Sequence, residues 1–192
     1  TEVWEREGLL HGSQYAFRAK KGTEGPLLLW SLMNDRAYLK KEDQARGQGD
    51  LKHAYDGVQP WAVELVLMRM GVPEGFVKYQ SKLTAMTKTA VITPFGVTEK
   101  FRRASGLPQG GTHSCALWNG FIDIMAEMQH RLAKKKGVMV EDEWGREWEL
   151  ITQLFADDAH HCAAGKECVE GLEERFKIAT LWSAFFGMEH RA

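Results

Sequence analysis

Two groups of carboxylates about a hundred residues apart have the clearest chemical potential in this chain. The first runs from Asp50 to Asp56 in DLKHAYD, and the second is Asp157-Asp158 in LFADD. Mg²⁺ prefers oxygen ligands and is usually bound by one or two carboxylates together with substrate phosphates and water. Two such ions, about 3.5–4 Å apart, can clamp the attacking and the leaving oxygen of a phosphoryl transfer. Carboxylates that converge from distant segments therefore predict this chemistry.

A third segment lies between the carboxylate groups. It reads SGLPQGGTHSCALWN, a Pro-Gln-Gly turn that opens a long amphipathic pattern. An aspartate-led stretch, then this turn and helix, then a two-aspartate turn is the order that the palm of a template-directed polymerase requires. Asp50 and Asp157 are the expected metal ligands. Asp158 points to the opposite face of an extended segment, so its expected role is secondary.

The elements that would position these residues can also be predicted. A strand from Trp148 to Phe155 should deliver Asp157, and helices from about Thr112 and over Lys166 to Phe185 should support the sheet. The segment from Lys40 to Gly49 is polar and predicts a loop or an exposed edge. Its glycines and polar side chains are poor material for a buried strand, which puts the position of Asp50 in doubt.

Further helices and one hairpin are expected on either side of the first carboxylate group. The patterns predict the end of a helix over Glu2 to Leu10 and a helix that begins near Thr23, with Leu29, Leu32, Met33 and Leu39 on its apolar side. After Asp50 they predict a helix from Pro60, a packing helix with Phe76, Tyr79 and Leu83 on one face, and a hairpin around Pro94-Phe95-Gly96.

Composition narrows the class of protein. The chain has 192 residues, 44% of them hydrophobic, and no apolar run of the length that a membrane span needs. Its three cysteines show no CxxC spacing, so neither a disulfide framework nor a zinc site is expected. The first residue is Thr and no signal-peptide pattern follows, so we interpret the chain as an excerpt of an intracellular protein, nuclear or cytoplasmic and not secreted.

Five segments resemble the reverse transcriptases of non-LTR retrotransposons and group II introns. SQYAFRAKKGTEGPLLL is similar to a fingers motif of that family, and DLKHAYDGVQP resembles its first palm motif. GLPQGGTHSCALWN, LFADD and FFGMEHRA resemble the three motifs that follow, in the same order. The resemblance implies an α+β fold: a small antiparallel palm sheet backed by helices, with partial and mostly helical fingers and no thumb. Fingers are expected over residues 1–47 and 61–103, and palm over 48–60 and 104–192.

The resemblance also implies a role for each site residue. Asp50 and Asp157, with Asp158, would hold two Mg²⁺ ions, Mn²⁺ being an alternative ion. Tyr55 would lie under the incoming sugar and exclude a 2′-hydroxyl, Gln109 and Gly110 would line the nucleotide pocket, and Arg18 would approach the triphosphate or the template. The implied partners are an RNA template, a DNA primer and a dNTP, with no membrane and no evident protein partner.

Two other interpretations stay open at this point. The net charge of −1 and the polar Gln44 to Gly49 segment favour a catalytically inactive reverse-transcriptase-like domain that binds nucleic acid. A viral RNA-dependent RNA polymerase shares the spaced aspartates, but Tyr55, Ala156 and the Pro-Gln-Gly turn disfavour it. His160 and His161 are not expected to bind metal, because adjacent strand residues face opposite ways. Asp56 is expected to be structural, as a cap of the turn before Pro60 rather than a metal ligand. Asn119 is expected to tether backbone or to pack near the motif helix.

Overall fold

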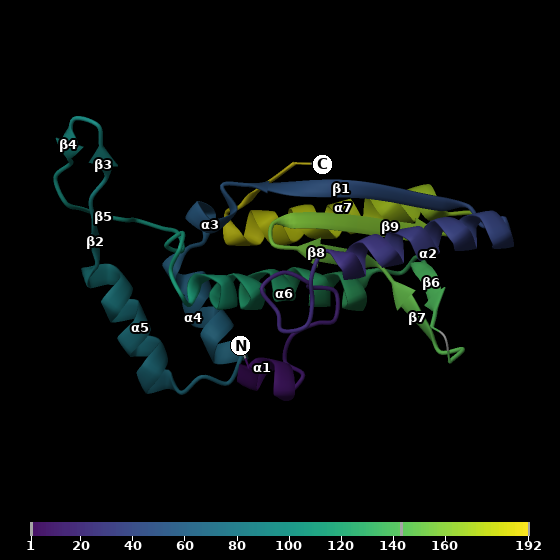
Figure 1. The fold of residues 1–192 in the computed structure, drawn as a ribbon, viewed down its shortest axis with the longest axis horizontal. Helices are drawn as coiled ribbons and strands as arrows, with labels where there is room; N and C mark the ends of the chain where they lie inside the picture. Colours follow the sequence, from purple (N-terminus) through teal and green to yellow (C-terminus); the bar gives the residue numbers. More distant parts are fainter. Residues whose placement is uncertain (1, 143, 192) are drawn as a thin grey trace.

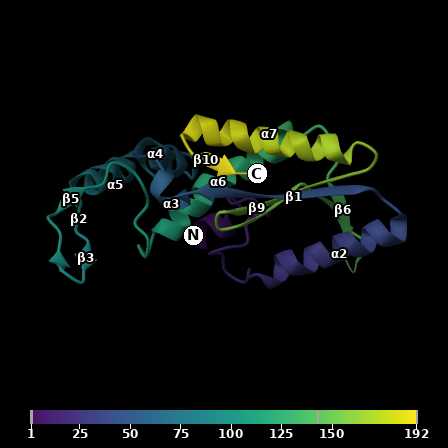
Figure 2. The ribbon, with the colours of Figure 1, turned by 90° about the horizontal axis from the view of Figure 1, so that it is seen from above.

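The computed structural model describes residues 2–142 and 144–191. Its centre is a four-stranded antiparallel sheet in the order β10-β1-β9-β8 (Figure 1; β10 is labelled in Figure 2). The strands are β1 (Gln44–Lys52), β8 (Thr152–Phe155), β9 (Asp158–Ala164) and β10 (Glu189–Arg191). The sheet brings both carboxylate groups together, as predicted, because β1 carries Asp50 and the β8–β9 hairpin carries Asp157 and Asp158.

Helices cover the two faces of this sheet. On one side lie α6 (Ser114–Leu132) and α7 (Cys168–Phe186), the two helices that the sequence predicts behind the sheet. On the other side lies α2 (Glu24–Lys40), as Figure 2 shows. The helix begins where Thr23 and Pro26 predict. Of the residues expected on its apolar side, however, Met33 is buried and Leu29 is partly buried, whereas Leu32 and Leu39 are exposed.

The polar segment before Asp50 is an edge of the sheet, which is one of the two predicted alternatives: residues 44–49 form most of strand β1, and in the described part of the chain they pair with β9 alone, since β10 pairs with residues 50–52. Residues 44–49 of β1 pair with β9, with Gly47 opposite His161. Arg46 uses its charge on the α2 side, where its guanidinium donates to Asn34 Oδ1 (2.6 Å) and lies 5.0 Å from the ring centre of Trp30. A cation over an aromatic face and a satisfied hydrogen bond make this polar strand tolerable.

Gly47 has a packing reason on the opposite face of β1. A Cβ at this position would lie 2.6 Å from Phe176 Cε2 and 2.8 Å from Phe176 Cζ, atoms that belong to α7. Glycine therefore allows the helix to approach the strand closely. From the sequence alone, this glycine indicates only a weak strand former. The expected fingers–palm boundary between residues 47 and 48 falls within this one strand.

The segment between β1 and α6 extends away from the sheet (Figure 1). It contains α4 (Pro60–Arg69) and α5 (Glu74–Met86), then a hairpin of short strands, β2 (Lys88–Thr89), β3 (Ile92–Thr93), β4 (Gly96–Val97) and β5 (Phe101–Arg102). The hairpin confirms the prediction around Pro94-Phe95-Gly96. The predicted packing face of α5 is not confirmed: Phe76, Tyr79 and Leu83 are all exposed, and Val77 is its buried residue.

The remaining elements are short. They are α1 (Glu2–Arg6), α3 (Ala54–Gly57), β6 (Val138–Glu141) and β7 (Glu147–Leu150). β6 and β7 form a separate hairpin, so the strand predicted from Trp148 to Phe155 is in fact two strands, of which β8 leads to Asp157. The sequence patterns did not indicate β6 or β10.

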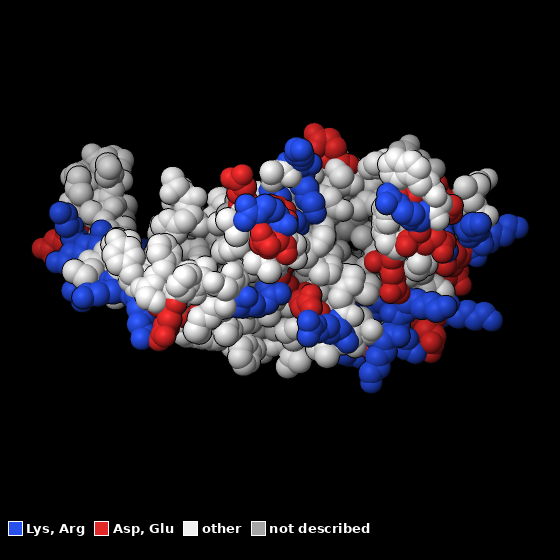
Figure 3. Space-filling view, turned by 90° about the horizontal axis from the view of Figure 1, so that it is seen from below, with Lys and Arg blue, Asp and Glu red and all other residues white. Residues whose placement is uncertain are grey.

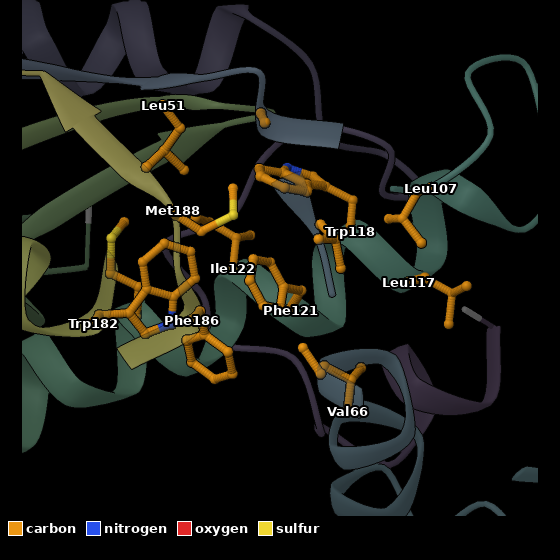
Figure 4. Close-up of a cluster of buried hydrophobic side chains, with 14 of the residues drawn as sticks. Leu51, Val66, Leu107, Leu117, Trp118, Phe121, Ile122, Trp182, Phe186 and Met188 are labelled. Carbon is orange, nitrogen blue, oxygen red and sulfur yellow. The ribbon is translucent and has the colours of Figure 1, made fainter. Parts of the chain in front are cut away.

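The main core lies where α6 and α7 meet the sheet and α4. Figure 4 shows its aromatic centre, in which Phe121 packs on Trp182 and on Phe186 with ring centres 4.9 Å apart in each pair. Trp118 and Trp182 are both fully buried in this cluster. The core therefore reaches from α7 to the end of the sheet that carries the aspartates.

Candidate active site

A hollow of about 480 Å³ lies at the end of β1. Of the residues predicted to form the site, Asp50, Tyr55, Gln109 and Asp157 line it together. They come from three segments that are far apart in sequence. Its remaining lining residues are Leu51, Lys52, His53, Ala54 and Asp56.

Asp50 reaches this hollow because β1 changes its partner there. The strand pairs with β9 up to Gly49 and with β10 from Asp50 onward. Asp50 is exposed and Asp157 is half-buried. Among the residues whose side chains the structure describes, neither carboxylate has a hydrogen bond or an ion pair. Both carboxylates line the hollow, which is where a bound cation would meet them.

Asp157 is presented by a tight turn between β8 and β9. Phe155 pairs with Asp158, which leaves Ala156 and Asp157 as the two central residues of the hairpin. Ala156 has a φ of 55°. A positive φ at the first central position alone is typical of a II′ hairpin turn, where glycine is favoured. The turn that carries Asp157 is thus strained, at a cost of about 1–2 kcal/mol for a residue with a Cβ.

Trp118 of α6 holds this turn from beneath. Its indole Nε1–H donates to the carbonyl oxygen of Ala156 at 2.9 Å. The same indole stacks on the Tyr55 ring, with ring centres 5.1 Å apart and an angle of 18° between the planes. One buried side chain therefore contacts both the aspartate turn and the aromatic residue of the first palm motif. The sequence patterns did not single out Trp118.

Tyr55 lies between this indole and the hollow. Burial raises the pKa of its phenol, and a hydrogen bond with the Cys115 side chain and the nearby charge of Asp157 raise that pKa further. The phenol therefore stays neutral throughout the physiological pH range. One face of its ring is held by the stacked indole of Trp118.

The Pro-Gln-Gly loop is tied to the segment that carries Tyr55. The backbone N–H of Leu107 donates to the Tyr55 carbonyl oxygen (2.7 Å), and the Ser114 hydroxyl donates to that of Pro108 (2.7 Å). These bonds hold Gln109 at the hollow. Gly110 follows with a φ of 79°, is exposed and does not line the hollow.

Two predicted site residues lie elsewhere. Asp158 is exposed outside the hollow, where its Oδ1 accepts a hydrogen bond from Gln48 (3.3 Å). Arg18 is buried in an ion pair with Glu5 (2.6 Å) and donates to the carbonyl oxygens of His11 and Gln14. Its guanidinium is held by the chain itself, so the structure does not bring Arg18 to the nucleotide side of the site.

Three secondary predictions agree with the contacts. His161 is buried, with its Nδ1 3.1 Å from the Thr152 Oγ1, whereas His160 packs edge-on against Trp30. The two imidazoles therefore face opposite ways. The Asn119 amide donates to the Ala16 carbonyl oxygen (3.0 Å), as expected of a backbone tether. Asp56 has a structural partner, but this is Arg103 (2.8 Å) rather than a helix cap.

The donor set can be compared with what a divalent ion requires. Across residues 2–142 and 144–191, no group of three or more His, Cys, Asp or Glu side chains could hold a metal ion. Asp50 and Asp157 are two carboxylates at one hollow. This matches the way Mg²⁺ is usually bound, by one or two carboxylates with the rest of its ligands from phosphates and water, and does not match an all-protein cage.

Two surface properties are relevant to partners. Within the described part of the chain, no helix is both long and apolar enough to cross a membrane. Basic side chains gather around α5 and its hairpin, at the left end of the face in Figure 3. Residues 71–103 contain six Lys or Arg residues and two Glu, which gives this segment a charge of +4 in a chain whose net charge is −1.

Comparisons with known proteins were made at the level of family and of structure. The family described as reverse transcriptase (RNA-dependent DNA polymerase) matches residues 2–189. A search of curated proteins gave no match. Apo telomerase from Candida tropicalis is similar in structure, with a TM-score of 0.67 and 11% identity, over 99% of this chain and 34% of that one.

Two further telomerase structures give the same result. The C. tropicalis enzyme truncated from its C-terminal domain has a TM-score of 0.63 and 12% identity, over 99% of this chain and 38% of that one. The enzyme from Candida albicans, in complex with a TWJ fragment of telomeric RNA, has a TM-score of 0.64 and 10% identity, over 92% of this chain and 30% of that one. The chain thus spans about a third of the solved structures that it matches, and these likenesses establish the fold alone. Since the family match extends over nearly the whole chain, the chain belongs to the reverse transcriptase (RNA-dependent DNA polymerase) family.

Proposed function

We propose that the chain is the fingers and palm part of an RNA-directed DNA polymerase that adds a dNTP to the 3′-hydroxyl of a primer. The observation that carries this proposal is the convergence of Asp50 and Asp157 on one hollow with Tyr55 and Gln109. Two carboxylates, an aromatic side chain and an amide at one site are the groups that a nucleotide and its metal ions would use.

Asp50 and Asp157 would hold two Mg²⁺ ions, or Mn²⁺ in their place. When bound, such ions neutralise phosphate charge and stabilise the attacking and leaving oxygens. The chain's own residues then do the positioning, which is the main demand that phosphoryl transfer makes on a protein. We assign Asp158 a secondary role, because its carboxylate accepts from Gln48 and lies outside the hollow.

Tyr55 would select the sugar. Its ring is held against Trp118 and it lines the same hollow as both aspartates. A rigid aromatic edge under the incoming nucleotide would collide with a 2′-hydroxyl, so the substrate would be a deoxynucleotide. Gln109 would lie on the nucleotide and template side of the same pocket, with Gly110 giving the loop its positive φ.

The template would pass along the basic α5 and hairpin segment. Lys78, Lys82, Lys88, Lys100 and Arg102 are all exposed there. Clustered Lys and Arg neutralise backbone phosphates, and a local excess of positive charge is sufficient for this even where the net charge of a chain is near zero. Support for RNA as the template comes from the family, which is described as an RNA-dependent DNA polymerase.

The finer assignment is to a mobile retroelement of the non-LTR or group II intron type. It depends on the order of the five motifs along the chain, from SQYAFRAKKGTEGP to FFGMEHRA. The telomerase likenesses, at 10–12% identity, concern the fold and do not select a subclass.

The test is primer extension on an RNA template with dNTPs and Mg²⁺, for the wild-type chain, Asp157→Asn and Asp56→Asn. Asp157→Asn keeps the side-chain shape and replaces a charged metal ligand with a neutral one. Extension should fall by at least about 10³-fold, because the metal ions that Asp157 would hold stabilise the transition state. Asp56→Asn is the matched control, because Asp56 lines the same hollow but is bound to Arg103. It should retain extension within about threefold.

The outcomes separate the proposal from its alternative. Extension that is lost in Asp157→Asn and kept in Asp56→Asn supports the polymerase. A wild-type chain that binds an RNA template with its primer, yet extends no primer with Mg²⁺ or Mn²⁺, favours the inactive nucleic-acid-binding domain. Equal extension by wild type and Asp157→Asn would refute the assignment of the metal ligand.

A further inference from the structure

One buried indole connects the two parts of the site that must be aligned for polymerisation. Trp118 donates its Nε1–H to the Ala156 carbonyl oxygen and stacks on Tyr55. It is completely buried, and its other aromatic neighbour, Phe121, connects it to the core (ring centres 5.7 Å apart). Among the side chains that the structure describes, Trp118 alone donates a hydrogen bond to the Ala156 carbonyl.

We propose that Trp118 is a positioning residue that sets the Asp157 turn and the Tyr55 ring in register with each other. This inference rests on the proposed function and adds a residue to it. Trp118 does not line the hollow and would touch neither nucleotide nor metal. It would act through the two residues that it contacts.

The turn needs such a contact because its backbone is strained. Ala156 has a φ of 55°, a conformation that favours glycine, and local strain of this kind persists only where the surroundings hold it. The indole N–H gives the Ala156 carbonyl a directed partner from a rigid helix. Phenylalanine would keep an aromatic ring at this place but is smaller and has no N–H to donate, so this contact depends on tryptophan.

The ring contact has a different consequence. Tyr55 and Trp118 are nearly parallel, with ring centres 5.1 Å apart. α6 therefore holds the proposed sugar gate at its face. Removing the indole would leave the ring free to rotate, and a mobile ring excludes a 2′-hydroxyl less well.

The two contacts can be separated by two substitutions. Trp118→Phe keeps an aromatic ring under Tyr55 and removes the N–H, whereas Trp118→Leu removes the ring as well. For Trp118→Phe we expect kcat in primer extension to fall about tenfold, the KM for dNTP to change less than about twofold, and the preference for dNTP over rNTP to be kept. For Trp118→Leu we expect the preference for dNTP over rNTP to fall by a factor of roughly ten.

Trp182 offers a matched control in the same core. It is also completely buried and packs on Phe121 and Phe186, but its Nε1 has no hydrogen-bond partner in the described part of the chain. Trp182→Phe and Trp182→Leu therefore remove similar buried surface without touching the turn. If Trp118 acts only as a core residue, both pairs of variants should lower stability alike and leave sugar preference unchanged.

A measurement on the wild-type chain makes the test independent of whether the variants fold. The indole N–H of Trp118 should exchange with solvent more slowly than that of Trp182, which is equally buried but has no hydrogen-bond partner in the described part of the chain. Exchange of the Trp118 indole as fast as that of Trp182 would overturn the inference, as would kinetics of Trp118→Phe that equal those of Trp182→Phe. A wild-type chain that extends no primer refutes the proposed function instead, and slow exchange would then still support the anchoring of the turn.

Discussion

Gly47→Ala is expected to destabilise the chain although it adds only one methyl group. The new Cβ would lie 2.6 Å from Phe176 Cε2, 2.8 Å from Phe176 Cζ and 3.5 Å from Leu172 Cδ1. The first two distances are well below ordinary carbon contacts of about 3.5–4.0 Å, so either the ring or the strand must move. Overpacking of this kind costs about 1–3 kcal/mol.

The assay is unfolding in urea, followed by circular dichroism. With a slope of about 1–3 kcal/mol per molar urea for a small protein, a loss of about 2 kcal/mol should lower the midpoint by roughly 1 M. Gly75→Ala is the control, because Gly75 lies in α5 and a Cβ added there would meet no atom within 4 Å. That substitution should leave the midpoint unchanged or raise it, since alanine is the better helix former by up to about 1 kcal/mol.

A double-mutant cycle tests the cause. If the Phe176 ring is the obstacle, Gly47→Ala should cost much less when Phe176 is already alanine, and the two substitutions should show a coupling energy of about 1 kcal/mol or more. A Gly47→Ala midpoint equal to that of the wild type, or a cost that is the same with and without the ring, would refute the reasoning about close approach of α7 to β1.

Two further predictions concern residues outside the hollow. Arg18→Met should lower the free energy of unfolding by about 2–4 kcal/mol, because it leaves Glu5 and two backbone carbonyls without their partner, while the KM for dNTP in primer extension should stay within about twofold. A raised KM for dNTP without a loss of stability would contradict this and would support a role for Arg18 in nucleotide binding. His130→Gln should flatten the dependence of stability on pH. Burial lowers the pKa values of His130 and His11, whose ring centres are 4.2 Å apart. The charge of His130 lowers the pKa of His11 further. The unfolded chain therefore binds more protons, so the contribution to stability should be complete above the ordinary histidine pKa of 6.5 and decline as the pH falls below it. The measurement is the urea midpoint between about pH 5 and 8, and an equal change of midpoint with pH in wild type and variant would contradict this.

The parts of the site that the sequence predicts are those with local signals. Asp50, Asp157 and Gln109 stand in motifs whose order defines the palm, and their convergence follows from the sheet. The helices from Thr23, Pro60 and Thr112 are marked by first-turn residues and by apolar spacing. These signals depend on a few neighbouring residues, so a single sequence contains them.

The parts that the sequence does not reveal depend on contacts between distant segments. Arg18 has the same residue type whether it binds a phosphate or Glu5, and only the return of the chain beside α1 decides between the two. The apolar spacing of Phe76, Tyr79 and Leu83 indicates a helix face correctly but not whether anything covers it. Trp118 could have been noticed as a hydrogen-bond donor within an apolar stripe, yet its acceptor is a backbone carbonyl 38 residues away.

The polar strand bears directly on the choice between polymerase and inactive binding domain. Its composition is one of two reasons for the inactive alternative, since glycines and polar side chains over residues 44–49 argue against a strand that positions Asp50. Each anomaly has a partner in the fold: Arg46 lies over Trp30 and bonds Asn34, Gln48 bonds Asp158, and Gly47 admits Phe176. The composition therefore matches the contacts of an edge strand rather than a damaged strand. The other reason, low net charge, is offset by the +4 charge of residues 71–103, so what separates the two functions is the chemistry of Asp50 and Asp157 alone.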